Sequence, residues 1–384
     1  MARKLVTVRR IGAIKPIKGA DRIEVAVVDG WNCIVKKGVF SEGHLGVFFE
    51  IDSFLPSTDL RWSFLEKSFT NWINGLTGFR VKSTKMRGQI SQGLLEPLDM
   101  FPEIGSVLKE LEDKHGKDAV ERLVRDMSFE DGLKVVKWEP MDSTSGRGNG
   151  NALNTTVPFP AFLNRTDQER AQNLPRMFDE WTNEMFQETT KMDGSSMTVY
   201  FLRKDSDKTQ LLPELGTSPE QTTTLPGGRF GVCSRHVDLG EHDANGRRFW
   251  EVAKRNNFAT KLSELNRNIA LQGELCGDSI QRNFESFPKN FHDFFLFSVW
   301  DIDEQKYLKP KEAEVMATKL GVRHVPVHGY FYLRDIATSV DELLSRAEGK
   351  GLRGKKREGI VLKHSDGGIS FKVISNSYLL KHGE

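Results

Sequence analysis

The chain has 384 residues, 38% of them hydrophobic and 28% charged, which excludes an intrinsically disordered protein and allows two or three domains with cores of their own. Its 55 Lys and Arg residues nearly balance its 53 Asp and Glu residues, so any affinity for a polyanion would depend on where the cations lie. One basic cluster is formed by Arg9 and Arg10. A second is formed by Lys350, Arg353, Lys355, Lys356 and Arg357.

The cysteines and the hydropathy of the chain indicate the cellular compartment in which we expect the protein. Cys33, Cys233 and Cys276 are far apart and odd in number, so they form neither a disulfide framework nor a CxxC metal site. The strongest apolar run, 291–300, is too short to span a membrane, and the N-terminus lacks the apolar core of a secretory signal. We therefore expect an intracellular protein, cytoplasmic or nuclear, with no membrane partner.

The first hundred residues predict a small β-rich domain. Short apolar or alternating runs, punctuated by turn signals such as Asp29-Gly30, are typical of strands. The predicted strands cover 5–8, 22–28, 33–35 and 46–51, and two more lie between 78 and 95. This close spacing favours a barrel or a sandwich, and a helix is expected over 107–125.

A change in composition then marks a domain boundary. Residues 142–156 begin with a run rich in Ser, Gly and Asn and predict an exposed linker between a first domain, 1–141, and a second, 157–384. The second domain mixes strands with helices. Helices are expected after the capping-box spacing at Thr166 and over 248–265, 311–320 and 339–346.

The tetrapeptide Lys191-Met-Asp193-Gly is the first motif that suggests chemistry. A K-x-D-G pattern is weak by itself, because about one chain in ten of this length contains one by chance. On this motif alone, an exposed lysine beside an Asp-Gly turn is the better explanation.

Three later segments strengthen the functional interpretation of that motif. A glutamate interrupts the apolar run Gly273-Glu274-Leu-Cys-Gly, another opens the run Glu358-Gly-Ile-Val, and Lys372 lies between aromatic and branched residues in Ser-Phe-Lys-Val. Each is more often structural when alone, since a glutamate at a strand end is usually solvated and a strand lysine usually extends to water.

In this order the segments resemble the motif series of the covalent nucleotidyltransferases, which comprise ATP-dependent DNA ligases, RNA ligases and mRNA capping enzymes. The resemblance implies that Lys191 is the nucleophile that takes AMP from ATP and that Lys372 contacts the α-phosphate. It implies that Asp193, Glu274 and Glu358 bind Mg²⁺ or Mn²⁺ or its water ligands, with Glu274 also able to contact the ribose.

The chemistry explains why these residue types recur. A lysine must attack phosphorus as a neutral amine, although a free ammonium keeps its proton well above pH 7. Desolvation and neighbouring positive charge favour the amine, and a divalent metal neutralises the phosphate oxygens. Carboxylates suit such a metal, and a strand lysine suits the reacting phosphate.

Three further nucleotide-binding residues follow from the same resemblance. The aromatic strand 293–300 is similar to the one that stacks on adenine, and Phe297 is the ring we assign, although a plain buried strand is as good a reading for any single ring. Arg170 resembles the family's upstream arginine. Arg235 resembles a cation that reaches phosphate or nucleic acid after the nucleophile hairpin.

One position departs from the family pattern. The last motif usually has two lysines separated by one residue, and here the second position is Ile374. Either another cation replaces it, with Lys363 and Lys381 as candidates, or that contact is missing.

The order of the domains narrows the range of possible substrate classes. Too few residues follow Lys372 for the C-terminal barrel that DNA ligases and capping enzymes append, and the β-rich domain comes first. This order resembles the Naegleria-type RNA ligases. The resemblance implies an α+β fold, with an N-terminal OB-fold β-barrel and an ATP-grasp-like nucleotidyltransferase domain built on antiparallel sheets.

The resemblance also implies an activity: a monomeric ATP-dependent RNA ligase that joins 3′-hydroxyl and 5′-phosphate ends in RNA repair. The alternatives are a DNA ligase or capping-type enzyme, and a non-catalytic OB protein that binds nucleic acid.

Overall fold

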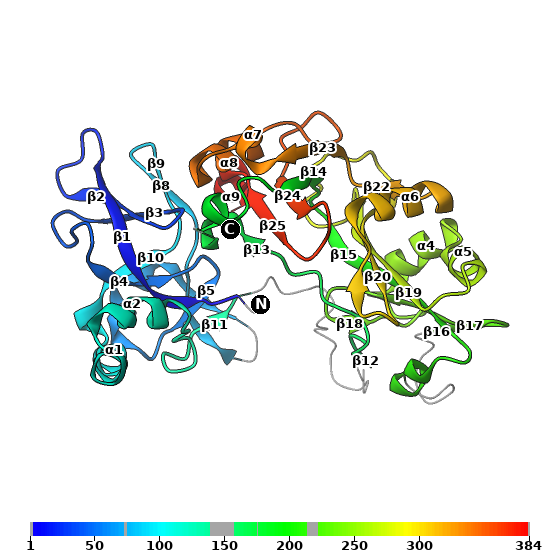
Figure 1. Ribbon diagram of the computed structural model, residues 1–384, viewed down its shortest axis with the longest axis horizontal. Helices are drawn as coiled ribbons and strands as arrows, with labels where there is room; N and C mark the ends of the chain where they lie inside the picture. The colour runs from blue at the N-terminus through cyan, green and yellow to red at the C-terminus, as the bar shows by residue number, and fades with distance from the viewer. Residues whose placement is uncertain (1–2, 73–74, 139–156, 175, 213–221, 383–384) are drawn as a thin grey trace. The chain divides into compact units, whose positions relative to one another are not determined.

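The computed structural model describes residues 3–72, 75–138, 157–174, 176–212 and 222–382. Their contacts divide the chain into two compact units (Figure 1). Unit 1 comprises Met1–Asp142, Ala171–Pro175 and Asn376–Glu384, and unit 2 comprises Ser143–Arg170 and Arg176–Ser375. The whole predicted linker, 142–156, lies outside the described residues, so the predicted domain limits stay predictions.

Unit 1 is built on antiparallel strands. A five-stranded sheet has the order β10-β4-β1-β2-β3, a four-stranded sheet the order β11-β5-β7-β6, and β8 pairs with β9. The strands are β1 (Val6–Pro16), β2 (Ile23–Val28), β3 (Trp31–Lys36), β4 (Leu45–Phe49), β5 (Ser53–Pro56), β6 (Phe69–Asn71), β7 (Thr77–Arg80), β8 (Thr84–Met86), β9 (Gln89–Ser91), β10 (Leu94–Pro97) and β11 (Val136–Lys137). The four early strands predicted from apolar alternation are confirmed.

Two helices complete the core of unit 1. They are α1 (Pro102–His115) and α2 (Lys117–Arg125). The single helix predicted over 107–125 is wrong in detail, because Gly116 adopts a φ of 81° and breaks it. The core is aromatic: the rings of Phe49 and Trp62 meet edge to face with centroids 5.0 Å apart.

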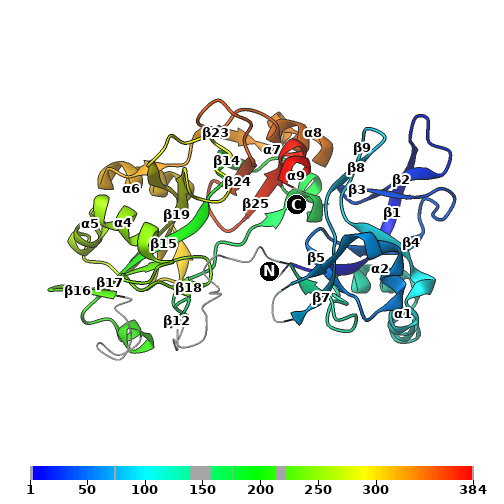
Figure 2. The same ribbon diagram turned by 180° about the vertical axis from the view of Figure 1, so that it is seen from behind.

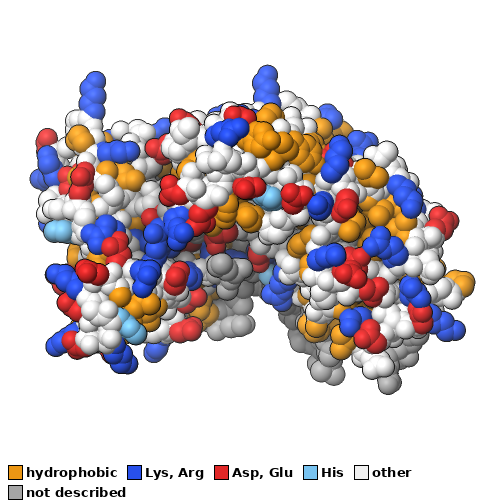
Figure 3. Space-filling model, in the orientation of Figure 1, with side chains coloured by type: hydrophobic (Ala, Val, Ile, Leu, Met, Phe, Trp, Pro, Cys, Tyr) orange, Lys and Arg blue, Asp and Glu red, His pale blue; other side chains and the backbone are white. Residues whose placement is uncertain are grey.

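The N-terminal basic cluster is neutralised inside unit 1. Arg9 Nη1 lies 3.1 Å from Asp29 Oδ2, and Arg10 Nη2 lies 2.5 Å from Glu121 Oε2. These arginines therefore offer little free charge to a polyanion. Figure 3 shows positive and negative side chains interspersed over the face it draws, in keeping with the near-zero net charge.

Unit 2 contains two larger sheets. The first has the order β12-β18-β17-β15-β19-β20-β21, with β16 and β22 attached, and the second has the order β13-β25-β24-β14-β23. The strands are β12 (Val157–Pro158), β13 (Glu169–Arg170), β14 (Met185–Lys191), β15 (Ser195–Arg203), β16 (Thr222–Leu225), β17 (Gly228–Cys233), β18 (Val237–Asp238), β19 (Ile269–Gly277), β20 (His292–Asp301), β21 (Lys306–Tyr307), β22 (Arg323–His324), β23 (Val327–Tyr332), β24 (Gly359–His364) and β25 (Ser370–Ile374).

Helices cover one face of each sheet (Figures 1 and 2). Alternate residues of β15, β19 and β20, including Val199, Leu271 and Leu296, pack against α4, α5 and α6 in the main core. On the second sheet, the rings of Phe186 and Phe371 meet with centroids 5.6 Å apart. The helices are α3 (Met177–Glu180), α4 (Arg247–Arg255), α5 (Phe258–Glu264), α6 (Pro310–Leu320), α7 (Leu333–Ile336), α8 (Val340–Ala347) and α9 (Asn376–His382), which belongs to unit 1. None of the helices among the described residues is long and apolar enough to cross a membrane.

Two helix predictions in unit 2 need correction. The helix expected after Thr166 shrinks to the four residues of α3, because Glu169–Arg170 instead pairs in parallel with β25 and a strand already begins at Met185. The helix expected over 248–265 divides at Asn257, whose φ is 53°. The helices predicted over 311–320 and 339–346 are confirmed. The first ends at Gly321, and the second begins after the N-cap Ser339.

Candidate active site

Lys191 is the last residue of β14, and sheet pairing brings Glu358 to it. Strands β14 and β24 run antiparallel with Lys191 opposite Gly359, so the residue before β24 lies beside the lysine. Lys191 Nζ is 2.7 Å from Glu358 Oε1, and the carboxylate is nearly buried. Two residues 167 positions apart thus form the centre of the site.

Glycines allow the strands around this pair to approach closely. A Cβ on Gly359 would lie 2.1 Å from the carbonyl oxygen of Val373, and one on Gly194 would lie 2.5 Å from that of Leu275 and 2.8 Å from Glu274 Cγ. The glycine of the K-x-D-G motif is therefore required for packing against β19. Close backbone approach is a common reason for glycine inside or beside a strand.

Gly359→Ala tests this close approach. We expect a loss of about 2–3 kcal/mol of stability, because the added methyl must push β25 away from β24. The same change should slow every reaction at Lys191. Gly105→Ala is the matched control, since nothing lies within 4 Å of its Cβ position in α1, and it should stabilise the protein slightly. Thermal unfolding of both variants measures the difference, and equal behaviour would contradict the packing argument.

Glu274 extends the site from the other sheet. It lies on β19, opposite Ser196 on β15 and Phe295 on β20, on the face that does not carry the main core. Burial raises its pKa to about 8, with the charges of Glu358 and Asp193 acting in the same direction and that of Lys191 opposing them. A carboxyl with such a pKa is mostly protonated at neutral pH.

The same charges affect the pKa of Lys191. Burial alone would lower the pKa of Lys191, but the carboxylates of Glu358, Glu274 and Asp193 outweigh burial and raise it above its ordinary value. Asp193 Oδ2 also lies 3.4 Å from the backbone nitrogen of Phe284. The site therefore places three acidic side chains around one ammonium, an excess of acid that favours binding of another cation.

Lys372 and Arg170 lie together on neighbouring strands. Lys372 on β25 is opposite Val361 on β24, and Arg170 on β13 is its partner in the parallel pairing. Residues opposite each other share a face, as do residues two apart along a strand. Lys372 therefore faces the same side as Lys191, two strands away.

Ile374 occupies the cross-strand row of the nucleophile. It lies opposite Gly359, which in turn lies opposite Lys191, and its side chain is buried. No cation stands at that position, so the departure from the family pattern is real. Lys363, one candidate replacement, lies on β24 with its amine directed at β20: Nζ donates to the carbonyl oxygen of Phe297 and lies 2.9 Å from Ser298 Oγ.

Phe297 is positioned by a β-bulge. The pairing of β19 with β20 shifts between Gln272 opposite Ser298 and Gly273 opposite Leu296, which leaves Phe297 without a partner across the ladder. A bulge reorients side chains and is common beside active sites. The ring packs against a cluster that includes Met192, the residue after Lys191.

The burial of Lys363 predicts that the stability of the protein depends on pH. Burial lowers the pKa of Lys363 to about 7, so at lower pH the folded protein holds a buried ammonium, whereas the unfolded chain holds a solvated one. Stability should therefore rise as pH increases from about 7 toward the ordinary lysine pKa. We expect Lys363→Met to stabilise the protein by about 1–2 kcal/mol at pH 6 and to lose that advantage near pH 10. Denaturant unfolding at both pH values tests this, and a gain independent of pH would refute it.

Arg235 lies next to the acidic cluster. Its guanidinium is 2.5 Å from Asp167 Oδ1, and its charge lowers the pKa of Glu274. All the residues predicted for the site therefore lie on strands of the two sheets of unit 2 or within two residues of a strand end. The candidate Lys381 lies on α9, in unit 1.

One network behind the site was not predicted. His328 Nε2 lies 2.9 Å from both Thr190 Oγ1 and Arg357 Nη1, so it accepts a hydrogen bond from the arginine as a neutral ring. Burial and the charge of Arg357 both lower the pKa of His328. The network joins the residue before Lys191 to the residue before Glu358. Nothing in the sequence signals it, because the three residues are far apart and form no motif.

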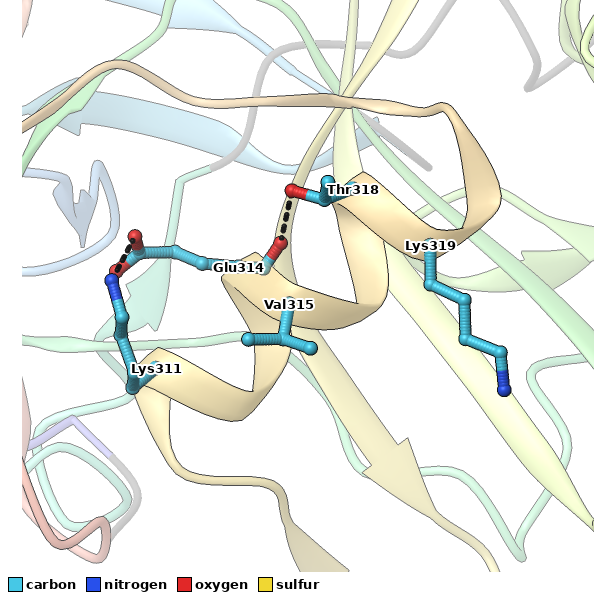
Figure 4. Close-up of a pocket in the computed structure, with 5 residues that line it drawn as sticks. All are labelled: Lys311, Glu314, Val315, Thr318 and Lys319. Atoms are coloured by element: carbon cyan, nitrogen blue, oxygen red, sulfur yellow. Dashed lines mark hydrogen bonds and ion pairs between the residues drawn. The ribbon is translucent and has the colours of Figure 1, made fainter.

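A surface pocket lies elsewhere. Its volume is about 360 Å³, and Figure 4 shows that its lining comes from α6 alone: Lys311, Glu314, Val315, Thr318 and Lys319. It contains none of the predicted site residues and carries no functional argument.

Comparisons with known proteins find two families that match the chain. An OB-fold domain family matches residues 5–98, and the RNA ligase family matches residues 184–374. A Naegleria gruberi RNA ligase mutant with AMP and Mn is 39% identical with a TM-score of 0.80, and the match covers 99% of each chain. Another mutant of that ligase with ATP and Mn is 38% identical over 100% of each chain with a TM-score of 0.79, and the ligase with PPi is 38% identical over 99% of each with the same score. No curated protein sequence matched the chain.

The chain belongs to the RNA ligase family. The predicted family, the N-terminal OB fold and the enzyme class are confirmed. The roles of individual site residues in this RNA ligase stay predictions.

The metal prediction for this RNA ligase is constrained by geometry. Within the described residues, no group of three or more His, Cys, Asp or Glu side chains is arranged to hold a metal ion by itself. Asp193, Glu274 and Glu358 nevertheless offer the oxygen ligands that Mg²⁺ and Mn²⁺ prefer. Such an ion would need water and phosphate oxygens to complete its shell, as is usual for Mg²⁺ at nucleotide sites.

Proposed function

We propose that this RNA ligase uses ATP to join an RNA 3′-hydroxyl to a 5′-phosphate through AMP bound to Lys191. The observation that carries the proposal is the convergence of Lys191, Glu358, Glu274 and Asp193, with Lys372 on the same face of the second sheet. Variants of the Naegleria gruberi ligase with ATP and Mn support ATP and a divalent cation as the ligands.

The first step is nucleophilic attack by Lys191. Its Nζ forms a bond to the α-phosphorus of ATP, the bond from that phosphorus to the bridging oxygen breaks, and pyrophosphate leaves. The amine must first lose a proton, and Glu358, 2.7 Å away, is placed to accept it. Asp193, Glu274 and Glu358 would hold a divalent cation, which neutralises charge on the phosphate oxygens.

Two further steps complete the reaction. An oxygen of the RNA 5′-phosphate attacks the AMP phosphorus, and the bond to Lys191 Nζ breaks. The RNA 3′-hydroxyl then attacks the activated 5′-phosphate, forms the phosphodiester and releases AMP. The lysine is thus regenerated for the next ATP.

The remaining site residues bind and orient the substrate. Lys372 and Arg170, adjacent on β25 and β13, supply positive charge to the α-phosphate. Phe297, turned by its bulge, offers a ring on which adenine stacks. Arg235, beside Glu274, reaches phosphate or the RNA end.

A ligation assay separates this proposal from its alternatives. Nicked duplexes with RNA or with DNA on the 3′-hydroxyl side are incubated with ATP or with GTP. We expect sealing with ATP when the 3′-hydroxyl belongs to RNA. Sealing only of DNA would indicate a DNA ligase, and covalent labelling by GTP a capping-type enzyme. RNA binding without any nucleotide transfer would leave a non-catalytic OB protein.

A further inference from the structure

The run 350–356, here named the basic loop, is an exposed cationic segment that the chemistry above does not use. It contains Lys350, Arg353, Lys355 and Lys356 and no acidic residue, and the side chains of all four are exposed. Within the described part of the chain, Lys350, Arg353 and Lys355 form no ion pair with a carboxylate. Leu352, also exposed (46%), adds an apolar side chain near the tip.

The backbone of the basic loop has a defined conformation. Lys350 and Lys356 form a β-bridge, and the backbone nitrogen of Gly351 donates to the carbonyl oxygen of Lys355 at 2.7 Å. Gly354 closes the turn with a φ of 75° and donates to the carbonyl oxygen of Gly351 at 3.1 Å. These contacts fix the backbone that carries the cations, which lowers the entropy lost on binding a ligand.

A buried carboxylate supports the loop from below. Glu285 is fully buried, and a Cβ on Gly351 would lie 2.4 Å from both of its carboxylate oxygens. Burial raises the pKa of Glu285, and the nearby backbone N–H groups of Arg353 and Leu352 oppose that shift. The loop therefore packs directly on this carboxyl group.

Glu285 belongs to a constrained segment beside the nucleophile. Gln281, Asn283, Ser286 and Asn290 all have φ between 46° and 65°, a conformation that L-residues rarely adopt and that tends to occur at functional sites. The backbone nitrogen of the neighbouring Phe284 lies 3.4 Å from Asp193 Oδ2. The segment that supports the basic loop thus contacts Asp193 of the K-x-D-G motif.

The C-terminal end of the loop is also fixed to the site. The buried guanidinium of Arg357 donates to the carbonyl oxygens of Ala347 at 3.0 Å and Arg346 at 2.5 Å, at the end of α8. The next residue, Glu358, pairs with Lys191. The exposed cations are therefore only a few residues along the chain from Glu358, which contacts Lys191.

We propose that the basic loop binds the phosphodiester backbone of the RNA strand whose end is being joined, an inference that rests on the proposed function. Spaced Lys and Arg side chains bind phosphates without reading sequence, and such contacts position a nucleic acid. Because the loop flanks Glu358, a strand bound there has its end near the adenylylated lysine. The loop acts in the two steps that involve RNA, and ATP attachment does not need it.

The test compares two triple variants of the full chain. One carries Lys350→Ala, Arg353→Ala and Lys355→Ala. The matched control carries Lys306→Ala, Lys311→Ala and Lys319→Ala, which remove equal charge from exposed positions elsewhere in unit 2. Binding to a nicked RNA duplex is measured at several salt concentrations, and AMP attachment is followed by intact mass.

We expect the loop variant to bind RNA about 10- to 100-fold more weakly, with a salt dependence reduced by about two to three phosphate contacts, and to gain AMP at the wild-type rate. The control variant should retain nearly all of its RNA affinity. Normal AMP attachment also shows that the variant is folded. Equal RNA affinity of both variants would overturn the proposal, and so would loss of AMP attachment in the loop variant, because the loop would then serve ATP.

Gly351→Ala provides a second test without any change in charge. Its methyl group would displace the loop from Glu285, so RNA binding should weaken by about 10-fold while AMP attachment persists. Unchanged RNA affinity would show that the position of the loop does not matter. If the wild-type protein never gains AMP but the loop variants still lose RNA affinity, the proposed function fails and the binding surface stands.

Discussion

Lys191→Ala is expected to abolish both AMP attachment and RNA sealing. No other described lysine is held by Glu358 beside Glu274 and Asp193, so no neighbouring amine can replace it. Loss of a covalent nucleophile typically lowers turnover by several orders of magnitude, and we expect less than about 0.1% of the wild-type rate. Attachment is measured by intact mass with ATP and Mn²⁺, and sealing by gel electrophoresis of a nicked RNA duplex.

Two controls accompany this prediction. Lys191→Arg keeps a positive charge beside Glu358 but has no amine that can lose its proton near neutral pH, so it should be equally inactive. A pre-adenylylated RNA end bypasses the first step, and the Lys191→Ala enzyme should retain part of its sealing activity on that substrate. Persistent AMP attachment in Lys191→Ala would place the nucleophile elsewhere.

Glu358→Ala is expected to slow AMP attachment at least about 100-fold. Two opposite effects compete in this variant. Removal of the carboxylate lowers the pKa of Lys191, because Glu358 is the strongest of the charges that raise it, and this favours the neutral amine. The same change removes the group placed to accept the amine's proton and to hold a cation near the reacting phosphate, interactions worth several kcal/mol.

We expect the loss of the carboxylate's catalytic contacts to dominate, because a larger fraction of neutral amine does not speed the reaction unless the triphosphate is held correctly. Single-turnover rates of AMP attachment across pH 6–9 measure the balance. Ser345→Ala, on the exposed side of α8, is a suitable control because it contacts none of the site residues. Faster attachment in Glu358→Ala at pH 7 would mean that Glu358 serves only as a counter-ion.

Much of the site could be predicted because its residues occur in motifs with strong local constraints. Gly194 and Gly359 are part of those motifs for a physical reason: each allows a backbone approach that a methyl group would prevent. Motif order therefore carries information about packing as well as chemistry. The position of Lys372 on the face of Lys191 then follows from strand alternation once the pairing is known.

Other features depend on pairings between distant segments. Residues 166–185 have the spacing of an amphipathic helix, but pairing of Glu169–Arg170 with β25 and of β14 with β24 overrides it. The bulge at Phe297 arises from a register shift that strand periodicity does not reveal. His328 contacts Thr190 across 138 residues, and Glu285 packs against Gly351 across 66, and no local pattern encodes such contacts.

Peptide mapping of the wild-type protein after incubation with ATP and Mg²⁺ or Mn²⁺ identifies the residue that carries AMP. We predict one AMP per chain, attached to the peptide that contains Lys191 and released when a nicked RNA duplex is added. A folded protein that gains no AMP under these conditions, or gains it on another residue, would contradict the account.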